Sequence, residues 1–95
     1  MTAYLYGDIT VTDPAVYEQY RAGVPAIVAA HGGSYLVRGG PADLLEGDDA
    51  PMRQVLLAFP DMASLLAFYD SPEYVALRAI RRRSSTGRLV AIEGI

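Results

Sequence analysis

Hydrophobic and polar residues alternate from Tyr4 to Val11, the first clear pattern along the chain. Because alternate side chains of an extended chain point to opposite faces, Leu5 and Ile9 fall on one face of a strand and Tyr4 and Tyr6 on the other. Three later segments, rich in aliphatic and aromatic residues and bounded by turn residues, are also predicted as strands: Ser34–Arg38, Arg53–Phe59 and Arg88–Glu93.

A helix is predicted between the first two strands. Asp13 is a favoured N-cap residue, and Pro14 suits the first helical position. The helix is predicted to end at His31, where the following glycines can supply a left-handed cap. Pro25 lacks a backbone donor, so we expect a kink or break near residues 22–24. Hydrophobic residues recur at helical spacing along this segment: Val16, Tyr20, Val24 and Ile27.

The second helical section, after the third strand, is divided in two. Asp61 is the predicted N-cap of a short helix, and Ser71, followed by Pro72, is the predicted N-cap of a longer one that runs to residue 84 or 85. Thr86 and Gly87 are predicted to turn the chain into the last strand. The order is therefore β-α-β-β-α-β in one domain, residues 1–95. This order predicts an α+β, ferredoxin-like fold, with a four-stranded antiparallel sheet covered by helices on one face.

The strands are more apolar than one covered face requires. Val55–Phe59 and Leu89–Ile92 are apolar on both faces, and strands of that kind are normally covered on both. The chain of 95 residues is 52% hydrophobic and contains no second helical layer. We therefore expect a two-fold homodimer in which two sheets pack against each other.

Composition excludes several classes of function. There is no cysteine or lysine, so thiolate nucleophiles, Cys-ligated metals and Schiff-base lysines are absent. The single histidine and the missing motifs predict neither a metal site nor a cofactor. A net charge of −3 argues against nucleic acid as a partner. No apolar run is long enough to predict a membrane span, and the N-terminus shows no signal-peptide pattern, so a cytoplasmic location is expected.

Several motifs resemble a family of short bacterial proteins named DUF1330, a domain of unknown function. They cover most of the chain: Val11–Pro14 with Tyr17 and Tyr20, Gly32–Gly33, Tyr35–Gly40, Leu45–Gly47, Phe59–Pro60, and Tyr69–Tyr74 with Arg81. The family is similar to the dimeric α/β-barrel superfamily, in which two ferredoxin-like protomers pack their sheets together. Many relatives carry Trp before the Tyr69–Tyr74 motif, whereas this chain has Phe68. The resemblance implies a fold and a dimer, but no established reaction.

Arginines and tyrosines are the candidate ligand-binding residues. Arg38 ends the second strand and Arg53 opens the third, its expected neighbour. On a helical wheel Arg81 lies beside the buried stripe, near Tyr74, and we place Tyr20 at the same cleft. An Arg fork beside tyrosines suits a carboxylate or an enolate. Arg38 and Arg81 could instead form internal ion pairs or, for Arg81, complement the helix dipole.

Three residues are candidates for moving a proton. Glu46 lies between apolar residues and a glycine, where partial desolvation can raise the pKa of a carboxyl group. His31 has an ordinary pKa near neutrality but could simply cap its helix. Asp8 lies on the tyrosine face of the first strand. Glu46 could alternatively be an ion-pair partner of Arg38.

These observations support three hypotheses. The first is a homodimer that binds a small acidic or enolisable molecule and acts as a cofactor-independent isomerase, cyclase or hydratase by proton transfer. The second, by analogy with some dimeric α/β-barrel enzymes, is a cofactorless monooxygenase. The third is a non-catalytic module for ligand binding or oligomerisation.

Overall fold

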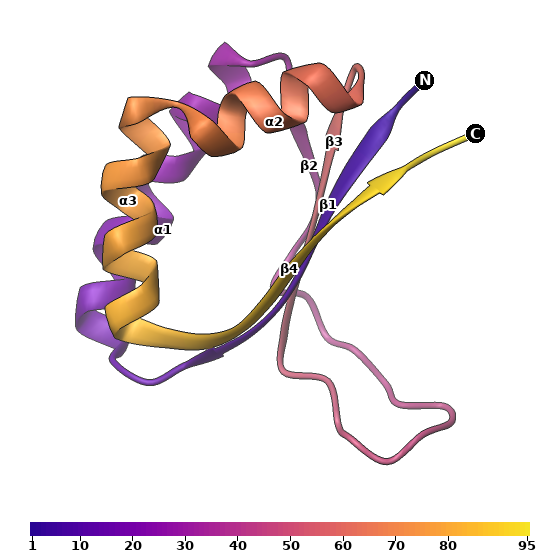
Figure 1. Cartoon of the computed structure of the whole chain (residues 1–95). Coiled ribbons are helices and arrows are strands. Elements are labelled where there is room, and N and C mark those ends of the chain that lie inside the picture. Colours follow the sequence, from indigo (N-terminus) through magenta and orange to yellow (C-terminus); the bar gives the residue numbers. More distant parts are fainter.

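The computed structural model describes the whole chain, residues 1–95, as one layer of helices on one antiparallel sheet (Figure 1). The strand order is β2-β3-β1-β4. This is the ferredoxin-like βαββαβ arrangement that the sequence predicts, with the second helical section split in two. The elements are β1 (Ala3–Val11), α1 (Pro14–Ala30), β2 (Ser34–Arg38), β3 (Arg53–Phe59), α2 (Met62–Asp70), α3 (Pro72–Ser84) and β4 (Ser85–Glu93).

The three predicted helix starts are confirmed by their capping hydrogen bonds. The Oδ1 atoms of Asp13 and Asp61 each accept from the backbone N–H three residues later, at 3.2 and 2.7 Å. Ser71 Oγ accepts from the Tyr74 N–H at 3.2 Å and donates to the Phe68 carbonyl at 2.8 Å. One serine therefore joins the end of α2 to the start of α3 and fixes the angle between them.

The expected break in α1 is not formed, because α1 continues through Pro25. The hydrogen bond that proline removes is the one to the Arg21 carbonyl, four residues earlier. That carbonyl instead accepts a hydrogen bond from Arg38 Nη2 at 2.9 Å. A side chain from β2 thus replaces the missing helical donor.

The predicted turn before the last strand is also wrong. β4 begins at Ser85, directly after α3, and Gly87 lies inside the strand, paired with Ile9. Gly87 has a φ of +136°, and an added Cβ would lie only 3.0 Å from the Ile9 Cα. The glycine is required by the close approach of β1 and β4, and not by a chain reversal.

The hydrophobic core lies between the inner face of the sheet and the helices. Leu5 and Ile9 point inward as the alternation predicts, and they are 5% and 3% exposed. Phe59 and Phe68 stack with their ring centroids 5.2 Å apart, and Phe68 lies 4.5 Å from the Tyr74 ring. None of the helices combines the length and the apolar character needed to span a bilayer.

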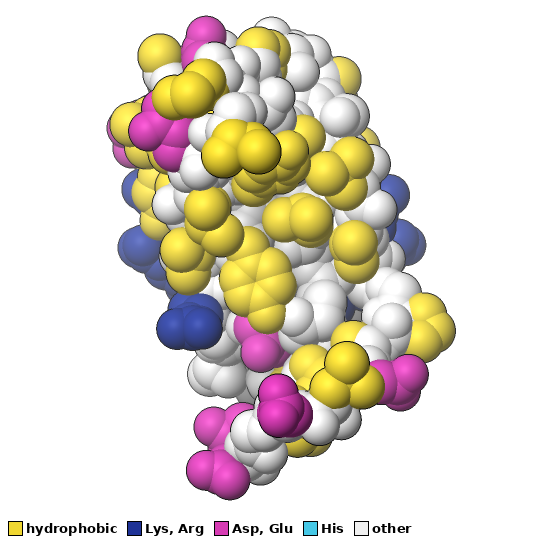
Figure 2. Space-filling view, turned by 90° about the vertical axis from the view of Figure 1, so that its right-hand side faces the viewer, with side chains coloured by type: hydrophobic (Ala, Val, Ile, Leu, Met, Phe, Trp, Pro, Cys, Tyr) yellow, Lys and Arg dark blue, Asp and Glu magenta, His cyan; other side chains and the backbone are white.

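The outer face of the sheet has no cover within the chain. Tyr6 on β1 lies between Leu56 on β3 and Val90 on β4, and all three point away from the helices. Figure 2 shows hydrophobic side chains gathered over the centre of this face, with arginines at its sides. The segment 39–52 leaves the lower end of the sheet as a long exposed loop without helix or strand (Figure 1).

Candidate functional site

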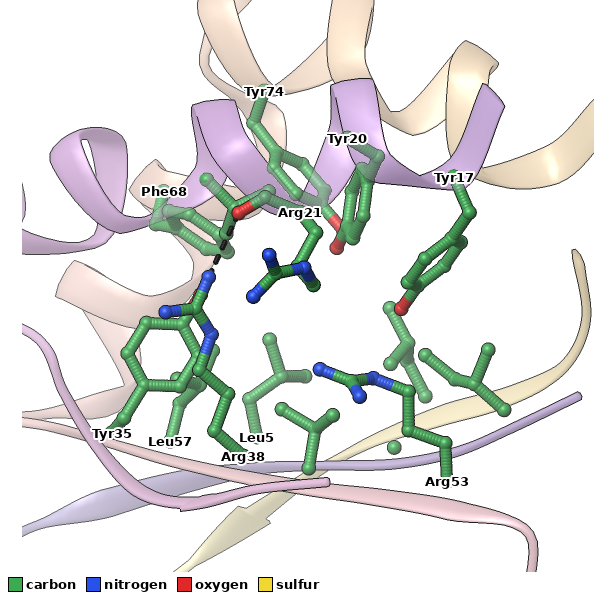
Figure 3. Close-up of a pocket in the computed structure, with 15 residues that line it drawn as sticks. Leu5, Tyr17, Tyr20, Arg21, Tyr35, Arg38, Arg53, Leu57, Phe68 and Tyr74 are labelled. Carbon is green, nitrogen blue, oxygen red and sulfur yellow. Dashed lines mark hydrogen bonds between the residues drawn. The ribbon is translucent and has the colours of Figure 1, made fainter. Parts of the chain in front are cut away.

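A pocket lies between the inner face of the sheet and helices α1 and α3 (Figure 3). Of its 15 lining residues, 11 are hydrophobic. The lining residues are Leu5, Gly7, Ile9, Tyr17, Tyr20, Arg21, Val24, Tyr35, Arg38, Arg53, Val55, Leu57, Phe68, Tyr74 and Leu89. An apolar pocket with a few polar groups on one side is typical of a small-molecule site.

Three arginines from three elements turn their guanidinium groups toward this pocket. Arg21 comes from α1, Arg38 from β2 and Arg53 from β3 (Figure 3). Arg38 pairs with Val55 across the β2–β3 ladder, and Arg53, two residues before Val55, shares the same inner face. The sequence prediction that Arg38 and Arg53 occupy neighbouring strands is confirmed. The antiparallel pairing brings their positive charges to one side of the pocket.

Arg53 is held without a hydrogen-bonding partner. Its Nε atom is buried and has no hydrogen-bond acceptor, and its guanidinium carbon lies 5.9 Å from the centre of the Tyr17 ring. Gly39, at a φ of +73°, leaves room for the Arg53 guanidinium, because an added Cβ at Gly39 would lie 2.8 Å from the guanidinium carbon. A buried donor without an acceptor is costly, so the site favours a ligand that brings an acceptor.

Arg38 is fixed over the pocket by two contacts. Its Nη2 donates to the Arg21 carbonyl that Pro25 leaves free, at 2.9 Å (the dashed line in Figure 3). Its guanidinium also lies over the Tyr35 ring, 4.9 Å from the ring centre. Only one of its donors is used by the protein, so the rest of the fork remains available to a ligand.

Electrostatically the pocket is positive. Arg21 forms an ion pair with Glu18 at 2.7 Å, and hydrogen bonding to Arg21 lowers the pKa of the exposed Glu18 carboxyl. Arg38 and Arg53 have no such partner, since this ion pair is the only one in the structure. No Asp, Glu or His lines the pocket.

Two tyrosines form the helical side of the pocket. The hydroxyls of Tyr20 on α1 and Tyr74 on α3 are 2.9 Å apart and share a hydrogen bond. Burial raises the pKa of Tyr20 far above that of a free phenol, and the neighbouring Tyr74 adds to the effect. Burial also raises the pKa of Tyr35. The pocket therefore presents neutral phenols, which can donate hydrogen bonds to an oxyanion.

The structure brings together four of the eight residues predicted as site residues: Arg38, Arg53, Tyr20 and Tyr74. Arg81 is buried as expected, but it lines a different cleft, formed where α3 meets β4.

The three predicted proton-transfer residues lie outside the pocket. Glu46 is exposed in the 39–52 loop. His31 caps α1, and its Nδ1–H donates to the Ile27 carbonyl at 2.9 Å. Asp8 points to the outer face of the sheet, where its Oδ1 accepts from the Met52 N–H at 3.2 Å. Each of these groups has a hydrogen-bond partner nearby or is exposed to solvent, and none of them lines the pocket with the arginines.

Three of the arginines and tyrosines that line the pocket were not predicted as site residues: Tyr17, Arg21 and Tyr35. Tyr17, Arg21 and Val24 recur at intervals of four and three, which is the spacing of one helix face. The predicted stripe begins at Val16 and so omits Tyr17 and Arg21, although it includes Tyr20 and Val24, which also line the pocket. Tyr35 stands three residues before Arg38 across a bulge in β2, and a sequence pattern does not show a bulge.

The family model for a domain of unknown function, DUF1330, matches residues 2–95. The chain belongs to the DUF1330 family. No curated protein matches it. Among solved structures, this DUF1330 protein is similar to a protein of unknown function from Rhodopseudomonas palustris, with a TM-score of 0.78, 14% identity, and coverage of 99% of this chain and 82% of that one.

Two further solved structures resemble the DUF1330 protein in fold. SnoaB, a cofactor-independent oxygenase from Streptomyces nogalater, has a TM-score of 0.67 and 20% identity, over 99% of this chain and 93% of SnoaB. A dimeric ferredoxin-like protein of unknown function from Thermobifida fusca has a TM-score of 0.66 and 18% identity, over 99% and 92%. At these identities the likeness establishes the fold alone.

Proposed function

We propose that this DUF1330 protein binds a small, largely apolar molecule with one anionic group, a carboxylate, phenolate or enolate. The observation that supports this most directly is the set of three arginines facing an aromatic pocket that no acidic residue lines. The apolar part of the ligand replaces water against Leu5, Leu57 and Phe68. The anionic group receives hydrogen bonds from Arg53 and Arg38, which the protein leaves largely free.

Such a site also makes an enolisable ligand more acidic. Positive charge next to the developing oxyanion favours its deprotonated form. Tyr20 and Tyr74 share a hydrogen bond in which one hydroxyl donates to the other, so one O–H of this pair can donate to the same oxygen. A stabilised enolate is a common intermediate for isomerisation, cyclisation and hydration. Glu46, His31 and Asp8 lie outside the pocket, so this proposal assigns the released proton to water at the mouth and gives those residues no role.

A second candidate function is cofactor-independent oxygenation, which the likeness to SnoaB favours. In this reaction a carbanion held by the arginines adds dioxygen and takes up a proton to form a hydroperoxide. Loss of water from the hydroperoxide then leaves a carbonyl group, so one oxygen atom enters the product and the other leaves as water. Ligand binding without chemistry is the alternative outcome. Oxygen consumption with an electron-rich phenol, measured with and without the protein, distinguishes the two.

The ligand proposal is tested with matched probes that differ in charge alone. We expect 2-naphthoate to bind at least about tenfold more tightly than 2-naphthamide, because only the carboxylate makes charge-assisted hydrogen bonds. Isothermal titration calorimetry measures both affinities. Arg53→Met should remove most of the difference, whereas Arg83→Met, an exposed control outside the pocket, should leave it unchanged. Equal affinities for the acid and the amide would contradict the proposal.

We also propose that the protein is a homodimer joined through the outer face of its sheet. The uncovered Val90 and Ile92 are 36% and 47% exposed, and the Thermobifida fusca neighbour is described as dimeric. Leu56→Glu, at the centre of this face, should convert the dimer to a folded monomer in sedimentation experiments. Val75→Glu, which charges an exposed apolar position on α3, is the control and should remain dimeric. A wild-type monomer at micromolar concentration would refute this proposal.

A further inference from the structure

A second cleft lies at the β4 edge of the sheet, where α3 runs directly into β4. It shares only Leu89 with the pocket described above. Its lining residues are Tyr69, Arg81, Arg82, Ser85, Thr86, Gly87, Arg88 and Leu89. Six of these eight residues are polar or glycine, apart from Tyr69 and Leu89, so the cleft contrasts with the apolar pocket. We propose that this cleft is a binding site for a small oxyanion that carries two negative charges, such as a phosphoryl group or a dicarboxylate.

Arg81 is the central observation. It is only 9% exposed, and its Nε atom is buried without an acceptor. Its guanidinium makes no hydrogen bond and no ion pair with any residue of the chain. A buried guanidinium is normally paired, because removing an unpaired charge from water is costly. The free acceptor position next to Arg81 is therefore the place where an oxyanion would lie.

The backbone around Arg81 is firmly held, so the group is preorganised. The Ser85 hydroxyl donates to the Arg81 carbonyl at 2.6 Å, and the Ser84 hydroxyl donates to the Ile80 carbonyl at 2.6 Å. These bonds close the last turn of α3 just before the chain becomes β4. Arg81 is thus presented from a rigid helix end, which reduces the entropy that a bound anion would have to offset.

The charge of the cleft matches a dianion. Arg82 lines it with Arg81, and no carboxylate is among the lining residues. Arg88 also lines the cleft, but it pairs with Asp8 across the β1–β4 ladder, so its side chain belongs to the outer face of the sheet. Neither exposed arginine has an ion-pair partner. Like charges in one cleft repel each other, and a bound dianion relieves that repulsion. The Tyr69 and Thr86 side chains make no hydrogen bond within the chain, so their hydroxyls can donate to the same ligand.

Titration with inorganic phosphate, followed by the NMR signals of the arginine Nε–Hε groups, tests this site directly. We expect the Arg81 signal to shift and to saturate at low millimolar phosphate, with little response to chloride at equal ionic strength. Phenyl phosphate and malonate serve as further probes. Tighter binding of phenyl phosphate than of malonate identifies a phosphomonoester, and the reverse order identifies a dicarboxylate.

Variants make the test specific. Arg81→Met should abolish saturable binding, and Arg82→Gln, at an exposed position that does not threaten folding, should weaken it about fivefold. Arg83→Gln removes an exposed arginine of the same helix turn that does not line the cleft, and it should change the affinity less than twofold. Equal weakening by Arg83→Gln and Arg82→Gln, or an Arg81 signal that does not move, would overturn the proposal and leave only diffuse attraction between charges.

Discussion

The two faces of this sheet are made of similar side chains placed in different surroundings. On the inner face Leu57 and Phe59 are 4% and 1% exposed beneath the helices, whereas on the outer face Val90 and Ile92 are 36% and 47% exposed. The helices that bury the inner face also leave the pocket, because arginines and tyrosines interrupt the apolar packing there. Burial within the chain therefore makes the inner face the main source of stability. The outer face can contribute comparably only when a partner covers it.

Truncating a core side chain should destabilise the protein most. Phe59→Ala should lower the free energy of unfolding by about 3–5 kcal/mol, because it removes a fully buried ring next to Phe68. Ile92→Ala, the matched change on the outer face, should cost less than about 1 kcal/mol in the monomer. Urea unfolding at two protein concentrations measures both.

Ile92→Ala also tests whether a second copy covers the outer face. If a second copy covers Ile92, the cost of Ile92→Ala will rise with protein concentration, because dimer formation is coupled to folding. The loss of unfolding free energy caused by Phe59→Ala, measured relative to wild type, should depend on protein concentration much less than the loss caused by Ile92→Ala. Identical concentration dependence for the two variants would contradict the assignment of one face to the core and the other to the dimer.

The next prediction concerns the pocket itself and uses two adjacent glycines. Gly39→Ala places a Cβ against the Arg53 guanidinium and strains a φ of +73°. We expect it to weaken naphthoate binding about tenfold and to cost about 1 kcal/mol of stability. Gly40→Ala is the control, since an added Cβ there meets nothing within 4 Å. Similar losses of affinity in both variants would show that Gly39 affects the loop as a whole and not Arg53.

The sequence predicts the fold well because the fold depends on local patterns. Alternation identifies β1, and capping residues such as Asp61 and Ser71 identify helix starts, because each acts over a few residues. Arg38 and Arg53 were correctly placed together because antiparallel neighbours follow from the element order. Glu46 was not, because nothing local shows that the 39–52 loop leads it away from the pocket into solvent.

Arg81 and Pro25 illustrate what local patterns leave out. The helical wheel places Arg81 beside the buried stripe and in a cleft, but the direct passage from α3 into β4 gives it a cleft other than the one predicted. The missing donor of Pro25, taken alone, predicts a kink or break near residues 22–24. The replacement donor, Arg38, lies 13 residues later in the chain, and only the tertiary structure brings it to the Arg21 carbonyl.

A smaller effect should appear at alkaline pH. Because burial raises the pKa of Tyr20 in the folded state, the folded chain keeps this proton when the unfolded chain loses it at about pH 10. The contribution of Tyr20 to the free energy of unfolding should therefore be constant below pH 10. Above pH 10 the free energy of unfolding should fall by up to about 1.4 kcal/mol per pH unit. Urea unfolding between pH 9 and 11 measures the slope. Tyr20→Phe should flatten it more than Tyr35→Phe, because Arg38 opposes the rise in the pKa of Tyr35.

The smallest expected effect separates stability from function within α1. Pro25→Ala restores a backbone donor to the Arg21 carbonyl, which then competes with Arg38 Nη2 for the same acceptor. We expect the helix to become slightly more stable and naphthoate affinity to fall about two- to threefold, because Arg38 becomes less firmly positioned. Pro14→Ala is the control, since the first helical position has no intrahelical bond to restore. A gain in stability without any loss of affinity would mean that the Arg38 fork is positioned by Tyr35 alone.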